Sequence, residues 1–298
     1  MITEQQAITP EEKLRRKLSG ITNLPSPPLV FNQITKIINN PRTSVKDVAA
    51  IMSEDAAMSA KVLRLSNSAF YGARSEITGI RQAVLVLGLE AIKSLVLSSS
   101  VFDMFKSHKL DPEFQESYWR HSLATAIGAR IVSQYHRVAR GLDPEVAFSA
   151  GLLHDIGKLI TCCFLPDEHK QIVEYREIHQ VSDYQAEVAT VNHPHTLVGR
   201  MLTANWKLPV SIQRAIEYHH FPLDDNEESR TYSHIIHFAN YLSKRTLGGK
   251  VTEYDNWSQL SPLVHAELDL TEEVIDAFCS KLREEYAASS TFMQLAMA

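Results

Sequence analysis

Apolar residues recur every three to four positions along most of the chain, which is the spacing of a helix with one buried side. Leu29, Ile34, Ile37 and Ile38 show this pattern, and it returns after each interruption by proline, glycine or a polar cluster. The β-branched runs typical of strands are short and scattered. Glycine and proline are also few, with 11 and 12 copies. The pattern therefore predicts an all-α protein.

The interruptions set the ends of the predicted helices. Pro10 opens a short charged helix, and Ser44 with Asp47 is typical of a capping box at a helix start. The other predicted helices span residues 29–38, 55–67, 79–88, 89–105, 114–136, 146–156, 166–179, 184–191, 196–205, 209–219, 232–245 and 271–286.

The composition allows a sizeable core and argues against one class of partner. With 44% hydrophobic residues among 298, the chain can form one large core or two smaller ones. The formal net charge is -5 and neither end carries a block of basic residues. We therefore expect no general binding of nucleic acid, which needs such residues to neutralise phosphates.

Cysteine usage and hydropathy bear on the compartment. Cys162, Cys163 and Cys279 give no disulfide framework and no C-x-x-C metal spacing, so we expect reduced thiols in a cytoplasmic protein. The polar residues 1–10 lack the apolar stretch of a signal peptide. No segment approaches the ~20 apolar residues that span a bilayer, so we expect no membrane partner.

The strongest chemical signal is the segment over residues 151–158, which holds the doublet His154-Asp155. The doublet offers a nitrogen and a carboxylate oxygen to a divalent cation, and the aspartate could bridge two ions. The helix that carries it is predicted to end at Gly157 and Lys158. Taken alone, such a pair is more often a helix end at which the histidine bonds a carbonyl and the aspartate pairs with the lysine.

Four further histidines lie on other predicted helices. His121 lies in the long helix over 114–136, His195 begins a later helix, and His219 and His220 end the next one. Any one of them alone is more often a hydrogen-bonded core residue than a ligand. Together, separate helices can aim all of them at one point. The predicted metal site comprises His121, His154, Asp155, His195, His219 and His220.

These residues resemble the HD superfamily of metal-dependent phosphohydrolases, and more specifically the HDOD family, the HD-related output domain of bacterial signalling proteins. The resemblance rests on an ordered set of motifs and not on the doublet alone. Besides the histidines, the set comprises Leu24 to Pro28, Asp55, residues 62–72, Ala83 to Gly88, Glu187, His195 to Gly199, Trp206 to Pro209 and Ala215 to Pro222.

The resemblance implies an all-α, HD-domain-like helical bundle with an additional N-terminal helical bundle. We expect an N-terminal helix within residues 1–19, an HDOD domain over 20–245 and a C-terminal helical extension over 246–298. A polar break before the long helix divides the domain into an N-terminal helical sub-domain over 20–106 and an HD-like sub-domain over 107–245.

Two departures from the superfamily bear on activity. HD phosphohydrolases supply a further aspartate to the metal from a downstream helix, and Asn240 stands at the nearest equivalent here. A neutral amide is a weaker oxygen ligand, so we expect a lower metal affinity. After His220 the chain departs from the Gly-Tyr-Pro signature of the related cyclic-dinucleotide phosphodiesterases, so that substrate is not carried over.

A divalent ion at this site would lower the pKa of a bound water for attack on a phosphoester. Iron, manganese, nickel, zinc and magnesium all remain open as the ion. Asp155 and Lys158 would then be the catalytic residues, and Lys158 or Arg120 would stabilise the phosphate charge. For Lys158, a cation at a helix C-terminus is an equally good interpretation, and for Arg120 a solvated side chain is the better one.

Three functions follow from these observations. The HDOD resemblance and Asn240 favour a non-catalytic regulatory module of bacterial signal transduction that binds a signalling protein partner. The intact doublet and the further histidines favour a metal-dependent phosphohydrolase. Binding of nucleic acid or nucleotides rests on the superfamily alone, and the negative net charge argues against it.

Overall fold

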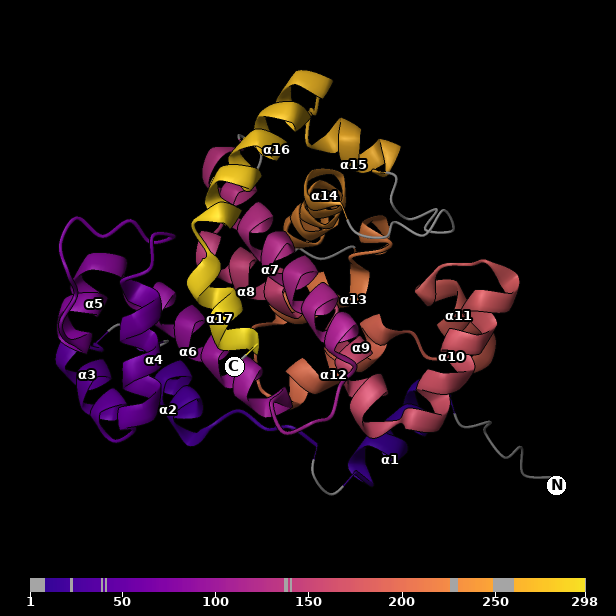
Figure 1. Cartoon of the computed structure of the whole chain (residues 1–298), viewed down its shortest axis with the longest axis horizontal. Helices are drawn as coiled ribbons and strands as arrows, with labels where there is room; N and C mark the ends of the chain where they lie inside the picture. The colour runs from indigo at the N-terminus through magenta and orange to yellow at the C-terminus, as the bar shows by residue number, and fades with distance from the viewer. Residues whose placement is uncertain are drawn as a thin grey trace, which may run out of the picture.

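The computed structural model describes residues 9–21, 24–38, 40, 42–136, 139, 141–225, 230–248 and 260–297. All regular elements in this part of the chain are helices, so the all-α class is confirmed (Figure 1). The first eight residues of the predicted N-terminal helix and residues 249–259 of the predicted extension lie outside the described residues.

The helices are α1 (Pro10–Ser19), α2 (Leu29–Ile38), α3 (Val45–Ser53), α4 (Ala56–Ser66), α5 (Ile80–Leu87), α6 (Leu89–Phe105), α7 (Pro112–Tyr135), α8 (Pro144–Leu153), α9 (Ile156–Phe164), α10 (Pro166–His179), α11 (Asp183–Thr190), α12 (His195–Asn205), α13 (Val210–Tyr218), η2 (Pro222–Asp224, a 3-10 turn), α14 (Arg230–Leu247), α15 (Pro262–Glu267), α16 (Glu272–Ala287) and α17 (Ser290–Met297).

Local signals place most of these helix ends. The predicted capping box forms at α3, where the Ser44 hydroxyl accepts from the Asp47 amide and the Asp47 carboxylate accepts from the Ser44 amide. A second capping box, between Thr9 and Glu12, starts α1. The short helices α15 and α17 were not predicted from the pattern.

One predicted helix ends earlier than expected and is followed by α9, which the pattern did not predict. The run over 146–156 is interrupted, because α8 ends at Leu153, the chain turns at His154 and Asp155, and α9 begins at Ile156. The doublet therefore lies at the break between two consecutive buried helices and not at the end of one. Both side chains are buried there.

The residues predicted to end that helix instead lie in the first turn of α9. The interpretation of Lys158 as a cation at a helix C-terminus is therefore wrong. Gly157 is explained by packing, because a Cβ would lie 2.0 Å from the carbonyl oxygen of His195 in α12. Gly151 in α8 has the same role, since its Cβ would lie 2.7 Å from the Cα of Ala126 in α7. Gly151 thus lets α8 approach α7, and Gly157 lets α9 approach α12.

The helices form two groups around a shared core. In Figure 1, α2 to α5 gather on one side of α6, while α9 to α13 lie on the other side of the central pair α7 and α8. The α14 helix packs against α7 and α13. Buried apolar side chains form one cluster that extends from Leu14 in α1 to Leu295 in α17.

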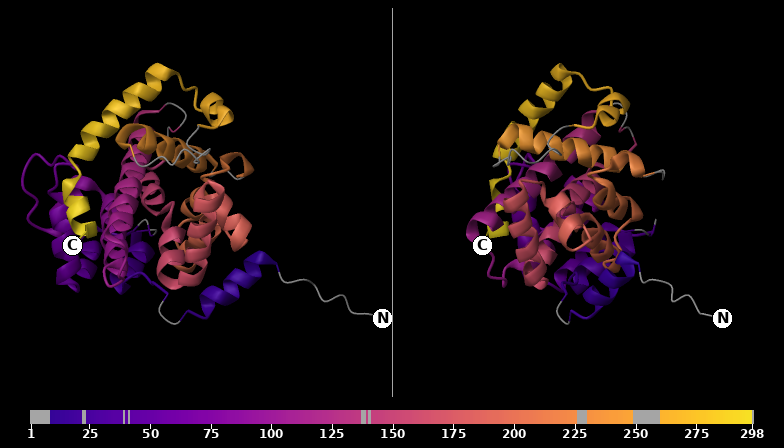
Figure 2. Two further views of the ribbon diagram at one scale, coloured as in Figure 1. Left: turned by 45° about the vertical axis from the view of Figure 1, so that its right-hand side comes forward. Right: turned by 90° about the vertical axis from the view of Figure 1, so that its right-hand side faces the viewer.

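Both ends of the described chain pack against this core. The α1 helix contacts α12, with Leu14 and Leu18 buried and Glu11 in an ion pair with Arg200 at 2.7 Å. The α16 and α17 helices run along one edge of the molecule (Figure 2). Phe292 in α17 is fully buried and lies between helices of both groups.

The segment Pro144–Phe164 has the length and mean hydropathy of a membrane span, which the sequence reasoning did not anticipate. It comprises α8 and α9, and 78% of its apolar window is buried inside the fold. The bent pair α5 and α6, at 119°, passes the same test only when taken as one span. Core helices of globular proteins share this composition.

Candidate metal centre

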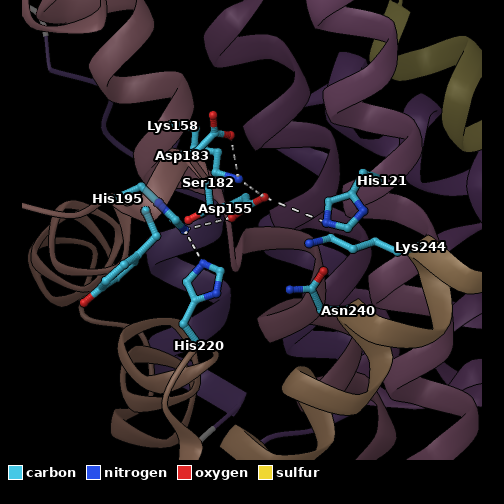
Figure 3. A pocket seen from close by; sticks show the side chains of 10 residues that line it. His121, Asp155, Lys158, Ser182, Asp183, His195, His220, Asn240 and Lys244 are labelled. Atoms are coloured by element: carbon cyan, nitrogen blue, oxygen red, sulfur yellow. Dashed lines mark hydrogen bonds and ion pairs between the residues drawn. The ribbon is translucent and has the colours of Figure 1, made fainter. Parts of the chain in front are cut away.

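The six residues predicted to bind a metal converge around the break between α8 and α9. His121 extends from α7, His195 begins α12, and His219 with His220 follows α13. Figure 3 shows His121, Asp155, His195 and His220 directed into one small polar cavity. The structure therefore brings together all the predicted ligands, which come from four separate segments.

Asp155 lies at the centre of the cluster and faces two groups of imidazoles. Its Oδ1 lies 3.1 Å from Nε2 of His195 and 3.7 Å from Nε2 of His219. Its Oδ2 lies 3.4 Å from Nε2 of His154 and 3.8 Å from Nε2 of His121. We call these the Oδ1 side, which also includes His220, and the Oδ2 side. Each side groups its nitrogens and the carboxylate closely enough to share one ion.

The other ring nitrogen of two histidines is fixed by a backbone carbonyl. His154 Nδ1 lies 2.8 Å from the oxygen of Gly151, and His219 Nδ1 lies 2.8 Å from the oxygen of Ile216. Because a carbonyl only accepts, Nδ1 carries the hydrogen in both rings, and Nε2 of the neutral ring keeps its lone pair. His219 Nε2 is buried and has no hydrogen-bond partner among the described residues.

Side chains fix two further rings. Glu187 in α11 accepts from both the backbone amide and Nδ1 of His195, at 2.8 and 2.7 Å. His121 Nδ1 lies 3.0 Å from the hydroxyl of Ser243 in α14. Such contacts orient metal-binding histidines so that Nε2 faces the ion. The sequence pointed to Glu187 only as a motif residue, and the structure gives it this positioning contact.

The imidazoles also face one another closely. His121 and His154 bring their Nε2 atoms to 3.2 Å, and so do His195 and His220. Two nitrogen lone pairs at this distance repel unless a proton or a cation lies between them. Each side of Asp155 is therefore suited to a cation.

Burial keeps most of the cluster in the form that binds metals. It lowers the pKa of His121, His219 and His220 well below the usual histidine value, and neighbouring imidazoles lower it further. These rings are therefore neutral near pH 7. Neutral imidazole is the ligand form of histidine.

Asp155 and His195 carry opposite charges. Burial raises the pKa of Asp155, but His154 and Lys158 outweigh burial and hold this pKa well below its usual range. Burial lowers the pKa of His195, but Glu187 and the hydrogen bonds of the ring raise it to about 9. Without a metal, an imidazolium thus neutralises the carboxylate on the Oδ1 side. An ion bound there must displace that proton.

A lysine approaches the other carboxylate oxygen. Lys158 Nζ lies 3.0 Å from Oδ2 of Asp155 and 3.5 Å from Oδ2 of Asp183. Asp183 also pairs with Arg176 at 2.7 Å. Figure 3 shows Asp183, Lys158 and Asp155 linked in this order by dashed lines. Sequence reasoning missed Asp183, because its position gave only a helix start after the capping residue Ser182.

The position equivalent to the superfamily's further aspartate also lies at the cavity. Asn240 in α14 lines it beside His121 and Lys244 (Figure 3). Its side-chain oxygen is buried without a hydrogen-bond partner among the described residues. Arg120, by contrast, does not line this cavity and lies near Tyr286 of α16.

The cavity itself is small and polar. Its volume is about 20 Å³, which is room for about one ordered water. Its lining comprises His121, Asp155, Lys158, Ser182, Asp183, Tyr184, His195, His220, Asn240 and Lys244. A metal ion with a water fits such a space, whereas a whole phosphoester needs the walls to move.

The HDOD domain model matches residues 24–222. The chain belongs to the HDOD family. The match ends before α14, so Asn240 and the C-terminal helices of this HDOD protein lie beyond the matched residues.

Solved structures share the fold. An HDOD domain protein of unknown function from Geobacter sulfurreducens is 26% identical, with a TM-score of 0.68 over 91% of this chain and 96% of that one. A candidate signal transduction protein from Marinobacter aquaeolei has a TM-score of 0.78 at 19% identity, over 97% of this chain and 66% of that one.

Sequence relatives are longer than this chain. An uncharacterised protein from Treponema pallidum is 26% identical over 237 residues, which is 79% of this chain and 44% of that protein. The HDOD chain spans less than half the length of the curated relatives that it matches.

Proposed function

We propose that this HDOD protein is a regulatory module of signal transduction that binds a divalent metal at its HD site without turning over a phosphoester. The observation that carries the proposal is the asymmetry around Asp155. The Oδ1 side has three imidazoles, whereas the Oδ2 side combines two imidazoles with the Lys158 ammonium and the neutral Asn240 amide. This donor set favours the binding of one ion. It disfavours the pair of ions, or the site with all its acidic ligands, that a hydrolase uses.

The residues that would hold the first ion are Asp155, His195, His219 and His220. The unpartnered Nε2 of His219 supports this assignment, because a buried nitrogen lone pair is costly unless it finds a donor or a cation. A second, weaker position would use His121 and His154 with Asp155 and the Asn240 oxygen. Donors that are mostly imidazole favour iron, nickel or zinc over manganese or magnesium.

Two features of the chain oppose catalysis. The cavity of about 20 Å³ excludes a phosphoester. The Lys158 ammonium already contacts the carboxylate oxygen on the Oδ2 side. A bound ion would still lower the pKa of a water. The chain offers little room for a substrate beside that water.

A phosphohydrolase is the second candidate. Lys158 and Lys244 both line the cavity, and two cations beside a metal centre suit the charge of a transferring phosphoryl group. This function requires the walls around Tyr184 and His220 to open. Asp155 and Lys158 would then act on the substrate directly.

The regulatory role requires a partner, and we propose a signalling protein in the cytoplasm. The family assignment supports this choice, as does the fold shared with the Marinobacter aquaeolei protein. The net charge of -5 argues against a nucleic-acid partner.

Metal analysis of protein purified without added metal, followed by assays on phosphomonoesters, nucleotides and cyclic dinucleotides, tests the proposal. We expect bound transition metal and no turnover on any of these substrates. Turnover that is lost in Asp155→Ala would establish the phosphohydrolase instead. Protein that binds none of iron, manganese, nickel or zinc, even when they are supplied, would contradict the metal site altogether.

A further inference from the structure

A histidine outside the predicted site holds the turn that carries His219 and His220. His237 in α14 places Nδ1 2.8 Å from the carbonyl oxygen of His219. Its Nε2 accepts a hydrogen bond from the backbone amide of Ser261 at 3.1 Å. The His237 side chain is buried, so neither bond can be replaced easily by water.

The two partners fix the state of the His237 ring. The carbonyl of His219 only accepts, so Nδ1 carries the hydrogen. The amide of Ser261 only donates, so Nε2 carries the lone pair. The ring is therefore neutral, and both of its nitrogens are used. A displacement of Ser261 removes one bond and frees the ring to rotate away from His219.

Ser261 belongs to a segment that lies beyond the HDOD match. It is the N-cap residue of α15, which also contacts α14 where Nδ1 of His234 lies 2.9 Å from a carboxylate oxygen of Glu267. The following helix, α16, pairs with α14 through Arg245 and Glu272, also at 2.9 Å. From there the chain continues to α17, which packs against α4, α6 and α7. The C-terminal helices α15 to α17 thus connect the N-terminal bundle to the His219 turn.

We propose that His237 is a positioning residue that couples α15 to α17 to the metal ligands His219 and His220. The inference rests on the metal site proposed above. A partner or signal that moves the C-terminal helices would change metal affinity through Ser261 and His237. By linkage, a bound metal would tighten the contact between Ser261 and His237 to the same extent.

The first test removes only the Ser261 hydrogen bond. The backbone of Ser261 has φ -55, which proline adopts without strain, so Ser261→Pro deletes the amide donor and keeps the chain path. Ser261→Ala is the matched control, because it keeps the amide and removes only the hydroxyl. We expect Ser261→Pro to bind zinc about fivefold more weakly than Ser261→Ala, the effect of one hydrogen bond.

Two substitutions of His237 separate its two bonds. Asparagine places an amide donor near the position of Nδ1, so His237→Asn should keep the bond to His219 and most of the zinc affinity. Glutamine places an acceptor near Nε2 instead, so His237→Gln should keep the bond to Ser261 and lose affinity. A role confined to packing would affect both variants alike.

Hydrogen exchange on the wild-type protein gives an independent measurement. Added zinc should slow exchange of the Ser261 amide by about the same factor that Ser261→Pro loses in affinity. The Met58 amide, which bonds Asp55 in the distant N-terminal bundle, should be unchanged.

Equal zinc affinity of Ser261→Pro and Ser261→Ala, or an unchanged exchange rate at Ser261, would overturn the coupling and leave the metal site intact. A wild-type protein that binds no transition metal would overturn both the coupling and the proposed function. The two failures are thus distinguishable.

Discussion

The two oxygens of Asp155 face environments built from different chemistry. On the Oδ1 side lie three imidazoles, and Glu187 positions one of them through two hydrogen bonds. On the Oδ2 side lie two imidazoles, the Lys158 ammonium at 3.0 Å and the Asn240 amide. One carboxylate therefore faces an imidazolium proton that a metal ion can displace on the Oδ1 side, and the Lys158 ammonium on the Oδ2 side.

In the proposed metal centre, this difference would leave the Oδ1 side able to bind an ion and would disfavour a second ion on the Oδ2 side. An ammonium close to a carboxylate oxygen supplies the charge that a second ion would supply, and it also repels that ion. The amide at Asn240 removes the negative charge that would offset this repulsion. The Oδ1 side is unaffected, since its ligands come from α12 and the turn after α13.

The close packing of α9 against α12, next to the Oδ1 side, should be the most sensitive to substitution. Gly157→Ala places a methyl group against the His195 backbone, so we expect the free energy of unfolding to fall by about 3 kcal/mol, the upper end for overpacking. Urea denaturation measures this change. Gly79→Ala is the control, because its Cβ meets nothing within 4 Å. Equal stability of the two variants would show that α9 and α12 can separate without cost.

Removing one histidine from each side tests the comparison directly. His220→Ala should weaken binding of the first zinc ion about 30-fold, whereas His121→Ala should change it less than about threefold. Both side chains are only partly buried, so both variants should fold. Titration of zinc by calorimetry distinguishes them. Equal losses would mean that the first ion does not prefer the Oδ1 side.

Substitution of Glu187, which accepts a hydrogen bond from the His195 ring, should have a smaller effect on zinc affinity. Glu187→Gln keeps an acceptor for the His195 ring but removes the negative charge, so we expect about tenfold weaker zinc binding. The same titration measures it, with Glu174→Gln on the exposed part of α10 as the control. Unchanged affinity would show that Glu187 acts only on folding.

The smallest expected effect is a gain in the affinity of the Oδ2 side for a second ion. Asn240→Asp restores a carboxylate beside His121, so we expect a second zinc ion to bind about fivefold more tightly than in the wild type. Asn240→Ala should bring no gain. Metal stoichiometry measured by elemental analysis checks the result. A second ion in the alanine variant would show that the amide is not what limits this side.

Much of this arrangement follows from local sequence. Apolar spacing gave the ranges of α2, α6 and α10, and capping residues such as Ser44 gave helix starts, because these signals act within a few residues. The six predicted ligands could be chosen because HDOD motifs carry them in order along the chain. Their roles as ligands remain a prediction.

Other features depend on contacts between distant segments. The segment at His154 and Asp155 was predicted as part of a continuous helix, whereas α8 ends at Leu153 and α9 begins at Ile156. The close approaches of α7 to Gly151 and of α12 to Gly157 also form only in the folded chain. Asp183 gives no sequence signal for its contact with Lys158, because that contact forms only when α9 and α11 pack together.

The sequence by itself thus determined the helical class, most helix ends and the identity of the candidate ligands. The pairing of Lys158 with Asp155 was one of the two local interpretations of the doublet, and the structure confirms it. Only the tertiary structure decided that Lys158 also contacts Asp183, and that Ser261 reaches the His219 turn through His237. The physical reason is range: helix formation and capping depend on neighbours in the chain, whereas charge pairing in a buried site depends on which helices meet there.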